Sequence, residues 1–315
     1  MVGSPRPSGT TMNQPNFFIV GAPKCGTTAL SEYLRGHPRV FVSQPKEPHY
    51  FSSDFDYYYA PGQWRLEHYL RLFDDAGEEH LAVGEASVWY LYSREAAAGI
   101  RAFDADARLI VMVRNPVDMV PSLHSQMSYM LDETEPDAEA AWRLQESRRE
   151  GVGVPESCRV PEFLQYGDAA KLGEQTRRLL EVVPREQVKI IVFDDLKRDA
   201  GAVYAEALAF LDVPDDGRRE FAPVNQNKTH RARWLATLTQ RPPRPLVAAA
   251  SGVKRGLRLE RLGVLDRVRE RNRVVARRPD ISPEFRRELA AYFRDDVEEL
   301  GEIVGRDLSA WTEVE

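Results

Sequence analysis

The stretch from Asn16 to Leu34, NFFIVGAPKCGTTALSEYL, constrains the possible folds of this chain more than any other. Phe17 to Val20 is a short apolar run that ends sharply at Gly21 and Pro23, which predicts a buried strand. From Thr27 onward the apolar residues recur at helical spacing, which predicts a helix. The chain is therefore expected to contain a strand–turn–helix unit near its N-terminus.

The turn of that unit, Gly21 to Thr28, has the composition of an anion-binding site. Backbone N–H groups at a helix N-terminus lack partners inside the helix, and the helix dipole makes that end positive. Lys24 adds a mobile charge, and Thr27 and Thr28 add hydroxyl donors. Cys25 lies in the same turn, either as a small filling residue or as a reactive thiol beside Lys24. An ordinary corner without a ligand is the alternative interpretation.

The position of the lysine separates this turn from the usual ATP and GTP loop. That loop has the pattern G-x-x-x-x-G-K-[ST], with the lysine after the second glycine. In this chain Gly26 is followed by Thr27, and Lys24 comes before Gly26. A P-loop kinase or NTPase is therefore a rival interpretation that lacks its lysine. A nucleotide-binding module without turnover is a second rival.

A second candidate phosphate motif follows the apolar run from Arg108 to Val113. Arg114 comes directly after this predicted strand, and Pro116 fits the first turn of a helix. A guanidinium at a strand end offers a planar fork to a phosphate, and Ser122 would donate a hydroxyl hydrogen bond from that helix. The alternative is an arginine and a serine in an ordinary strand–helix unit.

A third candidate site is the loop Pro45 to Phe51, which follows a predicted strand at Val40 to Val42. It holds Glu47 and His49, and prolines restrict its backbone. In an extended loop the two side chains would point the same way. A glutamate base would need its pKa raised by partial burial, whereas the unperturbed pKa of histidine suits a base at neutral pH. A surface turn is the alternative.

Together these motifs resemble those of sulfotransferases that use 3′-phosphoadenosine 5′-phosphosulfate (PAPS). G-x-P-K-x-G-T-T after a strand resembles their 5′-phosphosulfate loop, and R-[ND]-P-x5-S resembles their 3′-phosphate motif. The order Glu47, Pro48, His49 and two aromatics matches the heparan sulfate branch, where the glutamate is the proposed base. The resemblance covers about residues 16–234. One departure is Ala86, where that branch has a lysine near the sulfuryl group.

The resemblance implies transfer of a sulfuryl group from PAPS to a hydroxyl, or as second choice an amine, of a small-molecule or glycan acceptor. It implies no metal. Glu47 would act as the base, with Lys24 and His49 as the other catalytic residues. A basic loop would close over the 3′-phosphate, although the match of residues 223–234 to it is loose. The implied donor-binding residues are Lys24, Cys25, Gly26, Thr27, Thr28, Arg114, Ser122, Lys228, His230 and Arg231.

Alternation of predicted strands and helices indicates an α/β protein with a P-loop-like parallel sheet and helices on both faces. We expect a disordered tail over residues 1–15 and one domain over 16–315, with a helical region from about 235. Within that region the Arg-rich stretch Lys254 to Arg278 is expected to be helical. Residues Asp132 to Val160 are expected to form a mobile segment that acts as a lid.

Composition limits the remaining possibilities. The net charge of −6 argues against a general nucleic-acid binder. Two cysteines give neither a disulfide framework nor a cysteine-based metal cluster. No apolar run is long enough to span a membrane, and the polar N-terminus lacks the apolar core of a signal peptide, so a cytoplasmic location is expected. The acceptor and the oligomeric state are left open by these observations.

Overall fold

The computed structural model describes residues 14–56, 65–222, 228–230, 273–275 and 280–313. Its centre is a parallel sheet of five strands in the order β2-β3-β1-β4-β5. The strands are β1 (Phe17–Gly21), β2 (Val40–Val42), β3 (Ala82–Ala86), β4 (Arg108–Val113) and β5 (Val188–Val192). The strands named in the sequence analysis correspond to β1, β2 and β4, and β2 and β4 have the predicted bounds. The predicted parallel sheet is confirmed.

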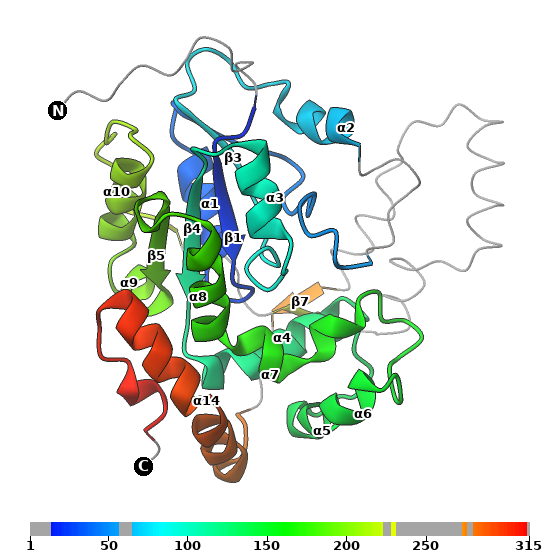
Figure 1. Cartoon of the computed structure of the whole chain (residues 1–315). Coiled ribbons are helices and arrows are strands. Elements are labelled where there is room, and N and C mark those ends of the chain that lie inside the picture. The colour runs from blue at the N-terminus through cyan, green and yellow to red at the C-terminus, as the bar shows by residue number, and fades with distance from the viewer. Residues whose placement is uncertain (1–13, 57–64, 223–227, 231–272, 276–279, 314–315) are drawn as a thin grey trace, which may run out of the picture.

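Both faces of the sheet are covered, which explains why its strands are continuous apolar runs rather than alternating ones. Every residue of β1 and β3 is buried. In Figure 1, α3 (Ala96–Phe103) and α8 (Leu172–Val182) lie in front of the sheet, and α1 (Thr27–Arg35) lies behind it. α10 (Ala200–Phe210) packs against α1. Helices on both faces were predicted and are confirmed.

The C-terminal helix α14 (Pro283–Val304) is an integral part of this packing. It begins with Pro283 in its first turn, and the Ser282 side chain accepts a hydrogen bond from the Phe285 N–H at 3.0 Å. It packs against α8 and against α4 (Pro116–Tyr129). Phe285 and Phe293 are fully buried and join the same hydrophobic core as the sheet.

The helices between β4 and β5 are mostly short. Residues 138–149 form two helices, α5 (Ala138–Arg143) and α6 (Gln145–Arg149). Residues 161–182 are divided into η2 (Pro161–Leu164), α7 (Tyr166–Ala170) and α8. The prediction missed α9 (Phe193–Arg198), which begins directly after β5. The other short helices are α2 (Leu66–Leu70), η1 (Arg71–Phe73), η3 (Arg185–Gln187) and η4 (Ser309–Trp311).

Two predictions for the C-terminal half of the chain are wrong at residues that the structure describes. Residues 228–230, expected in a loop, form β6 (Lys228–His230), and residues 273–275, expected in a helix, form β7 (Arg273–Val275). The two strands pair antiparallel. Ladder hydrogen bonds between segments far apart in sequence outweigh the helical spacing of the Arg-rich stretch. The described residues exclude the rest of 254–278 and most of the region from 235 to 279. They also exclude residues 1–13 of the tail expected over 1–15.

The segment from Asp132 to Val160, expected to be a mobile lid, contains a buried ion pair. Arg148 forms a two-bond ion pair with Glu133, at 2.7 and 2.8 Å, and both side chains are almost completely buried. Glu133 also accepts from the Tyr166 hydroxyl at 2.7 Å. Charged groups removed from water are held by this fork of bonds, which favours an ordered segment; its mobility stays a prediction.

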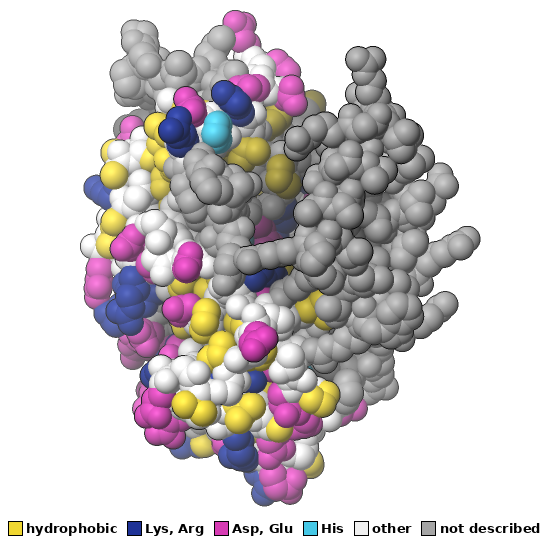
Figure 2. Space-filling model, turned by 90° about the vertical axis from the view of Figure 1, so that its right-hand side faces the viewer, with side chains coloured by type: hydrophobic (Ala, Val, Ile, Leu, Met, Phe, Trp, Pro, Cys, Tyr) yellow, Lys and Arg dark blue, Asp and Glu magenta, His cyan; other side chains and the backbone are white. Residues whose placement is uncertain are grey.

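The structure also bears on the membrane and on metals. In the part of the chain that the structure describes, no helix is both long and apolar enough to cross a membrane. Within the same part, no three His, Cys, Asp or Glu side chains form a group that could hold a metal ion. Figure 2 shows acidic and basic side chains interspersed over the described surface of one face.

Candidate active site

The three motifs singled out in the sequence meet at the carboxyl ends of the strands. The turn that begins at Gly21 follows β1, Glu47 follows β2, and Arg114 follows β4. The chain leaves β1 toward β2 on one side, whereas β4 lies on the other side of β1. Ligands of parallel α/β sheets bind at such a switch point.

Gly26 has the geometry that a phosphate-binding turn requires. Its φ of 88° lies in the left-handed region, and it is the N-cap of α1. A Cβ at this position would lie 2.8 Å from a ring carbon of Phe193 and 2.9 Å from a methyl of Leu196, both on α9. No side chain caps α1 and no acidic residue lies in its first turn. The positive end of α1 therefore faces the turn without a competing carboxylate.

Cys25 is a packing residue of this turn. Its side chain is fully buried, and its thiol donates to the carbonyl of Pro23 at 3.4 Å. Burial raises the pKa of the Cys25 thiol to about 12, although the charges of Arg114 and Lys24 oppose this effect. A thiol that stays protonated is a poor nucleophile, so the filling role fits the structure and the reactive role does not.

Arg114 lies against the phosphate turn. Its guanidinium donates to the carbonyl oxygen of Lys24 at 3.2 Å and lies over the ring of Phe193, 5.1 Å from the centroid. Lys24 itself has a φ of 66°, which is unusual for a residue with a side chain. The arginine from β4 thus holds the backbone of the turn at the residue whose ammonium was predicted to contact the donor.

Ser122 and β6 are both placed by α4. Ser122 is buried on this helix, with 2% of its surface exposed. β6 packs against α4, so the backbone of Lys228 and His230 lies beside the helix that carries Ser122. Arg231 lies outside the described residues, and the side chains of Lys228 and His230 are likewise not described.

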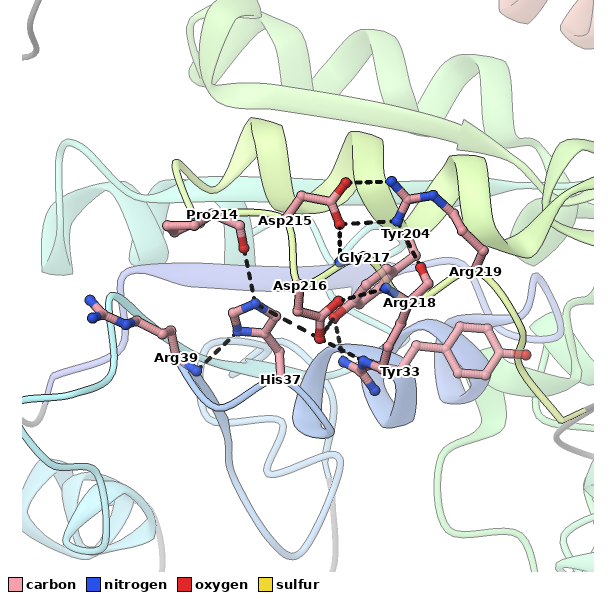
Figure 3. Close-up of polar contacts among 10 residues, drawn as sticks. All are labelled: Tyr33, His37, Arg39, Tyr204, Pro214, Asp215, Asp216, Gly217, Arg218 and Arg219. Atoms are coloured by element: carbon pink, nitrogen blue, oxygen red, sulfur yellow. Dashed lines mark hydrogen bonds and ion pairs between the residues drawn. The ribbon is translucent and has the colours of Figure 1, made fainter.

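A polar network joins α1 to the segment that leads toward β6 (Figure 3). His37, after α1, contacts the carbonyl of Pro214 through Nε2 at 3.0 Å and accepts from the Arg39 N–H through Nδ1 at 3.0 Å. Arg218 donates to the Tyr33 carbonyl at 3.1 Å. These contacts hold residues 214–218 against α1, which limits where the chain beyond them can go.

The catalytic candidates Glu47 and His49 lie within contact distance of each other. The Nε2 atom of His49 is 3.4 Å from Oε2 of Glu47. They converge because φ is 66° at Glu47 and 53° at His49. The loop is therefore not extended at these positions: both residues adopt the left-handed conformation, which costs about 1–3 kcal/mol at a residue that is not glycine. The surrounding hydrogen bonds hold it in place.

Lys46 completes this group, and the sequence reasoning missed it. Its ammonium donates to Glu47 Oε1 at 3.0 Å, to Thr28 Oγ1 at 3.1 Å and to Thr27 Oγ1 at 3.4 Å. It therefore bridges the candidate base and the first turn of α1. The only sequence signal was its position beside Glu47, which does not reveal that it reaches back to the phosphate turn.

The pKa of Glu47 is shifted in the opposite direction from the expected one. Burial raises its pKa, but the hydrogen bond from His49 and the charge of Lys46 outweigh burial and lower the pKa to about 2. The expectation of a raised pKa considered only the aromatic surroundings. Glu47 is thus held as a carboxylate, ready to accept a proton although weakly basic in this arrangement.

A second, buried carboxylate supports the loop from beneath. Glu85 is completely buried and accepts from the hydroxyls of Ser87 and Tyr90, both at 2.7 Å, and from that of Tyr69 at 3.3 Å. The Ser87 and Tyr90 oxygens accept from the backbone N–H groups of His49 and Phe51 at 3.0 and 3.2 Å. Glu85 therefore acts on the catalytic loop through two hydroxyls. Tyr69 had no signal in the sequence beyond the aromatic density around it.

A pocket of about 740 Å³ begins where the catalytic loop ends. Aromatic and carboxylate side chains line it. Its lining residues are Tyr50, Phe51, Ser53, Asp54, Phe55, Asp56, Glu95 and Gly99. Of the aromatic residues that follow the loop, Phe55 and Tyr69 are buried, whereas residues 57–64 lie outside the described residues.

Relatives of this chain are sulfotransferases. It is 33% identical to human carbohydrate sulfotransferase 15 over 147 residues and 38% identical to human heparan sulfate glucosamine 3-O-sulfotransferase 3B1 over 112 residues. These alignments cover 34% and 36% of this chain and 26% of each relative. The membrane-associated sulfotransferase kil1 of Dictyostelium discoideum is 29% identical over 159 residues, or 50% of this chain and 32% of kil1. The chain thus spans about a third or less of the length of these curated relatives.

The whole fold also has a solved counterpart. The crystal structure of a sulfotransferase from Alicyclobacillus acidocaldarius matches 95% of this chain and 99% of its own chain, with a TM-score of 0.69 and 28% identity. The family model described as the sulfotransferase domain matches residues 14–232, a range that contains every predicted site residue. The resemblance found in the motifs is confirmed, and the chain belongs to the sulfotransferase family.

Proposed function

We propose that this protein transfers a sulfuryl group from PAPS to a hydroxyl of a small-molecule or glycan acceptor. The observation that carries the proposal is the group formed by Glu47, Lys46 and the hydroxyls of Thr27 and Thr28, which joins a carboxylate to the phosphate turn. A carboxylate beside an anion site is the arrangement that proton removal and sulfuryl transfer need together.

The donor fits the residues that are described. The uncapped N-terminus of α1 suits a 5′-phosphate, with N–H groups of Gly26, Thr27 and Thr28 and the ammonium of Lys24 as its partners. Arg114, beside that turn, suits a 3′-phosphate together with Ser122. Lys228 and His230, whose backbone forms β6 beside α4, would add positive charge to this 3′-phosphate site. Arg231, which lies outside the described residues, is the third proposed partner.

In the reaction the acceptor hydroxyl gives its proton to Glu47 as its oxygen forms a bond to sulfur. The bond between sulfur and the oxygen of the 5′-phosphate breaks, and the products are the sulfated acceptor and 3′-phosphoadenosine 5′-phosphate. Lys24 would neutralise the charge that grows on the leaving phosphate. His49 would orient Glu47 through the contact between Nε2 and Oε2, at 3.4 Å.

The acceptor would enter beside the catalytic loop. The pocket lined by Tyr50, Phe51 and Phe55 offers aromatic faces, and Asp54 and Asp56 offer hydrogen-bond acceptors for hydroxyl groups. An amine acceptor is the second choice. A carbohydrate is suggested by the relatives, whose names specify carbohydrate and heparan sulfate substrates. The cytoplasmic location stays a prediction.

Thermal stabilisation tests the donor class. We expect 3′-phosphoadenosine 5′-phosphate to raise the melting temperature of the full chain, and ATP with Mg²⁺ to raise it less at the same concentration. Turnover of PAPS with a panel of hydroxylated acceptors then tests the reaction. Stabilisation by ATP with Mg²⁺ alone would support the kinase or NTPase alternative instead.

A further inference from the structure

Lys46 occupies a position that neither the motifs nor the proposed roles account for. It is separate from Lys24, the lysine of the phosphate turn, and it belongs to the catalytic loop. Its side chain is 17% exposed, so it is ordered against the protein rather than extended into solvent. The question is what an ammonium does between a base and a phosphate turn.

The contacts of Lys46 place its charge on the path between the two sites. On one side the ammonium donates to Glu47 at 3.0 Å, and on the other it donates to Thr28 at 3.1 Å and Thr27 at 3.4 Å. The two threonines are the first residues of α1, where the 5′-phosphate is proposed to bind. In an in-line transfer the sulfur lies between the acceptor oxygen at the base and the leaving oxygen at the phosphate.

The direction of these hydrogen bonds leaves the threonine hydroxyls useful for an anion. An ammonium can only donate, so the oxygens of Thr27 and Thr28 accept from Lys46. Each hydroxyl therefore keeps its own proton to donate elsewhere. The three N–H donors of Lys46 are all engaged, so the ammonium would release Glu47 Oε1 to donate to an anion, while both hydroxyls would turn their own protons to the same anion.

The strand end beside the catalytic loop carries no charge that could act in place of Lys46. The Glu47 N–H donates to the carbonyl of Ala86 at 3.1 Å, so the end of β3 lies directly beside the catalytic loop. The residue at that strand end is Ala86, which is fully buried and carries no charge. Among the described contacts of Glu47, the cationic partners are Lys46 and, when protonated, His49.

We propose that Lys46 is a catalytic residue that contacts the sulfuryl oxygens of the donor and stabilises their charge during transfer. This inference rests on the proposed function, because it assumes the sulfuryl donor. The ammonium would leave Glu47 Oε1 in part as the donor binds, while the threonine hydroxyls turn their protons to the same anion. Lys24 would act on the leaving phosphate and Lys46 on the group in transit.

Calorimetry without acceptor separates these two roles, because PAPS has the sulfuryl group and 3′-phosphoadenosine 5′-phosphate does not. For Lys46→Met, we expect PAPS affinity to fall roughly tenfold or more, with less than about a threefold change for 3′-phosphoadenosine 5′-phosphate, as loss of one charge-assisted contact predicts. Turnover at saturating donor should fall by about 10²-fold. Lys46→Arg, which keeps the charge, should recover part of both losses.

Lys189→Met is the matched control. Lys189, on β5, also pairs with a carboxylate, Glu206, at 2.6 Å, so this variant removes an ammonium and an ion pair away from the loop. It should leave both affinities and turnover unchanged. Melting temperatures show whether each variant folds, and Lys46→Gln replaces Lys46→Met if the latter does not.

The outcomes separate the inference from the proposed function. If wild type binds PAPS and turns it over, but Lys46→Met binds and reacts equally well, Lys46 has no catalytic role. Equal loss of both ligands would assign Lys46 to the 5′-phosphate and overturn the contact with the sulfuryl group. If wild type binds neither ligand, the proposed function fails and the inference fails with it.

Discussion

The guanidinium of Arg114 donates to the carbonyl oxygen of Lys24 at 3.2 Å, across 90 residues of sequence. This bond connects the two phosphate motifs directly. Arg114 therefore has two tasks in the proposed site: it holds the turn that receives the 5′-phosphate, and it offers its remaining N–H groups to the 3′-phosphate. The motifs are parts of one binding surface.

Replacing Arg114 by alanine should reduce selectivity for the 3′-phosphate. We expect affinity for 3′-phosphoadenosine 5′-phosphate to weaken by about 2–3 kcal/mol, the range for a hydrogen bond to a charged group. Adenosine 5′-phosphate should lose less, because it lacks the 3′-phosphate. Isothermal calorimetry with both nucleotides gives the difference.

A second arginine, at the start of β4, provides a control variant for Arg114→Ala. Arg108, at the start of β4, donates to the carbonyl of Phe210 at 2.7 Å, at the opposite end of the strand from Arg114. Arg108→Ala should leave nucleotide selectivity unchanged. If Arg114→Ala discriminates between the two nucleotides as well as wild type does, the assignment of Arg114 to the 3′-phosphate is wrong.

Glu47→Gln tests the base. Glutamine keeps the size of the side chain but cannot take the acceptor proton, so turnover should fall by roughly 10²-fold or more. Affinity for 3′-phosphoadenosine 5′-phosphate should stay near wild type. His49→Asn should cost less, and Lys24→Ala should reduce both affinity and turnover. Single-turnover rates, with affinity measured separately, distinguish the three; near-normal turnover of Glu47→Gln beside an inactive His49→Asn would make the histidine the base.

The sheet and the location of the site could be predicted from the sequence because both depend on local patterns. β4 is an apolar run bounded by charged residues, and its predicted bounds are those observed. In a parallel sheet, residues that directly follow strands converge on one edge. Lys24, Glu47 and Arg114 could therefore be placed together before any contact was known.

The chemistry of the base could not be predicted, because it depends on backbone conformations that the residue types disfavour. Glu47 and His49 approach each other only through positive φ angles, which residues with side chains rarely adopt. The contact between Lys46 and Thr28 joins the loop after β2 to α1. No spacing rule connects these residues, so neither the partners of Glu47 nor the direction of its pKa shift was visible in the sequence.

Removing one partner of the buried ion pair between Arg148 and Glu133 should strongly destabilise the protein. Arg148→Met leaves the Glu133 carboxylate buried without its cation, which should cost about 3–5 kcal/mol of unfolding free energy. The double variant Arg148→Met, Glu133→Gln should cost less, because no charge is left unpaired. Urea denaturation of the three proteins measures this, and equal losses in the single and double variants would contradict it.

Hydrogen exchange tests the same anchor without mutation. The amides of Thr134 and Glu135 both donate to Glu133 Oε1 at 2.8 Å, so they should exchange slowly in the free protein. Rapid exchange of both amides would support the mobile-lid interpretation.

The last prediction concerns Glu85, whose burial raises its pKa to about 7 although the hydroxyls of Ser87, Tyr90 and Tyr69 stabilise the carboxylate. In the unfolded chain its pKa returns to the ordinary glutamate value of 4.5. Between these values the folded state holds a proton that the unfolded state has lost. Raising the pH through this window should therefore lower the unfolding free energy, by up to about 3 kcal/mol. Glu85→Gln cannot ionise and should show a flatter dependence.

Denaturation at about pH 5 and about pH 8, on wild type and Glu85→Gln, gives the comparison that isolates this group. Other titrating residues contribute to both proteins alike and cancel in the difference between them. Glu206→Gln, at an exposed position on α10, is the control and should keep the wild-type slope. Glutamine still accepts from Tyr90 through its amide oxygen, so Glu85→Gln is expected to fold. Equal slopes in wild type and Glu85→Gln would mean that Glu85 is ionised in the folded protein throughout this range, held by its three hydroxyl partners.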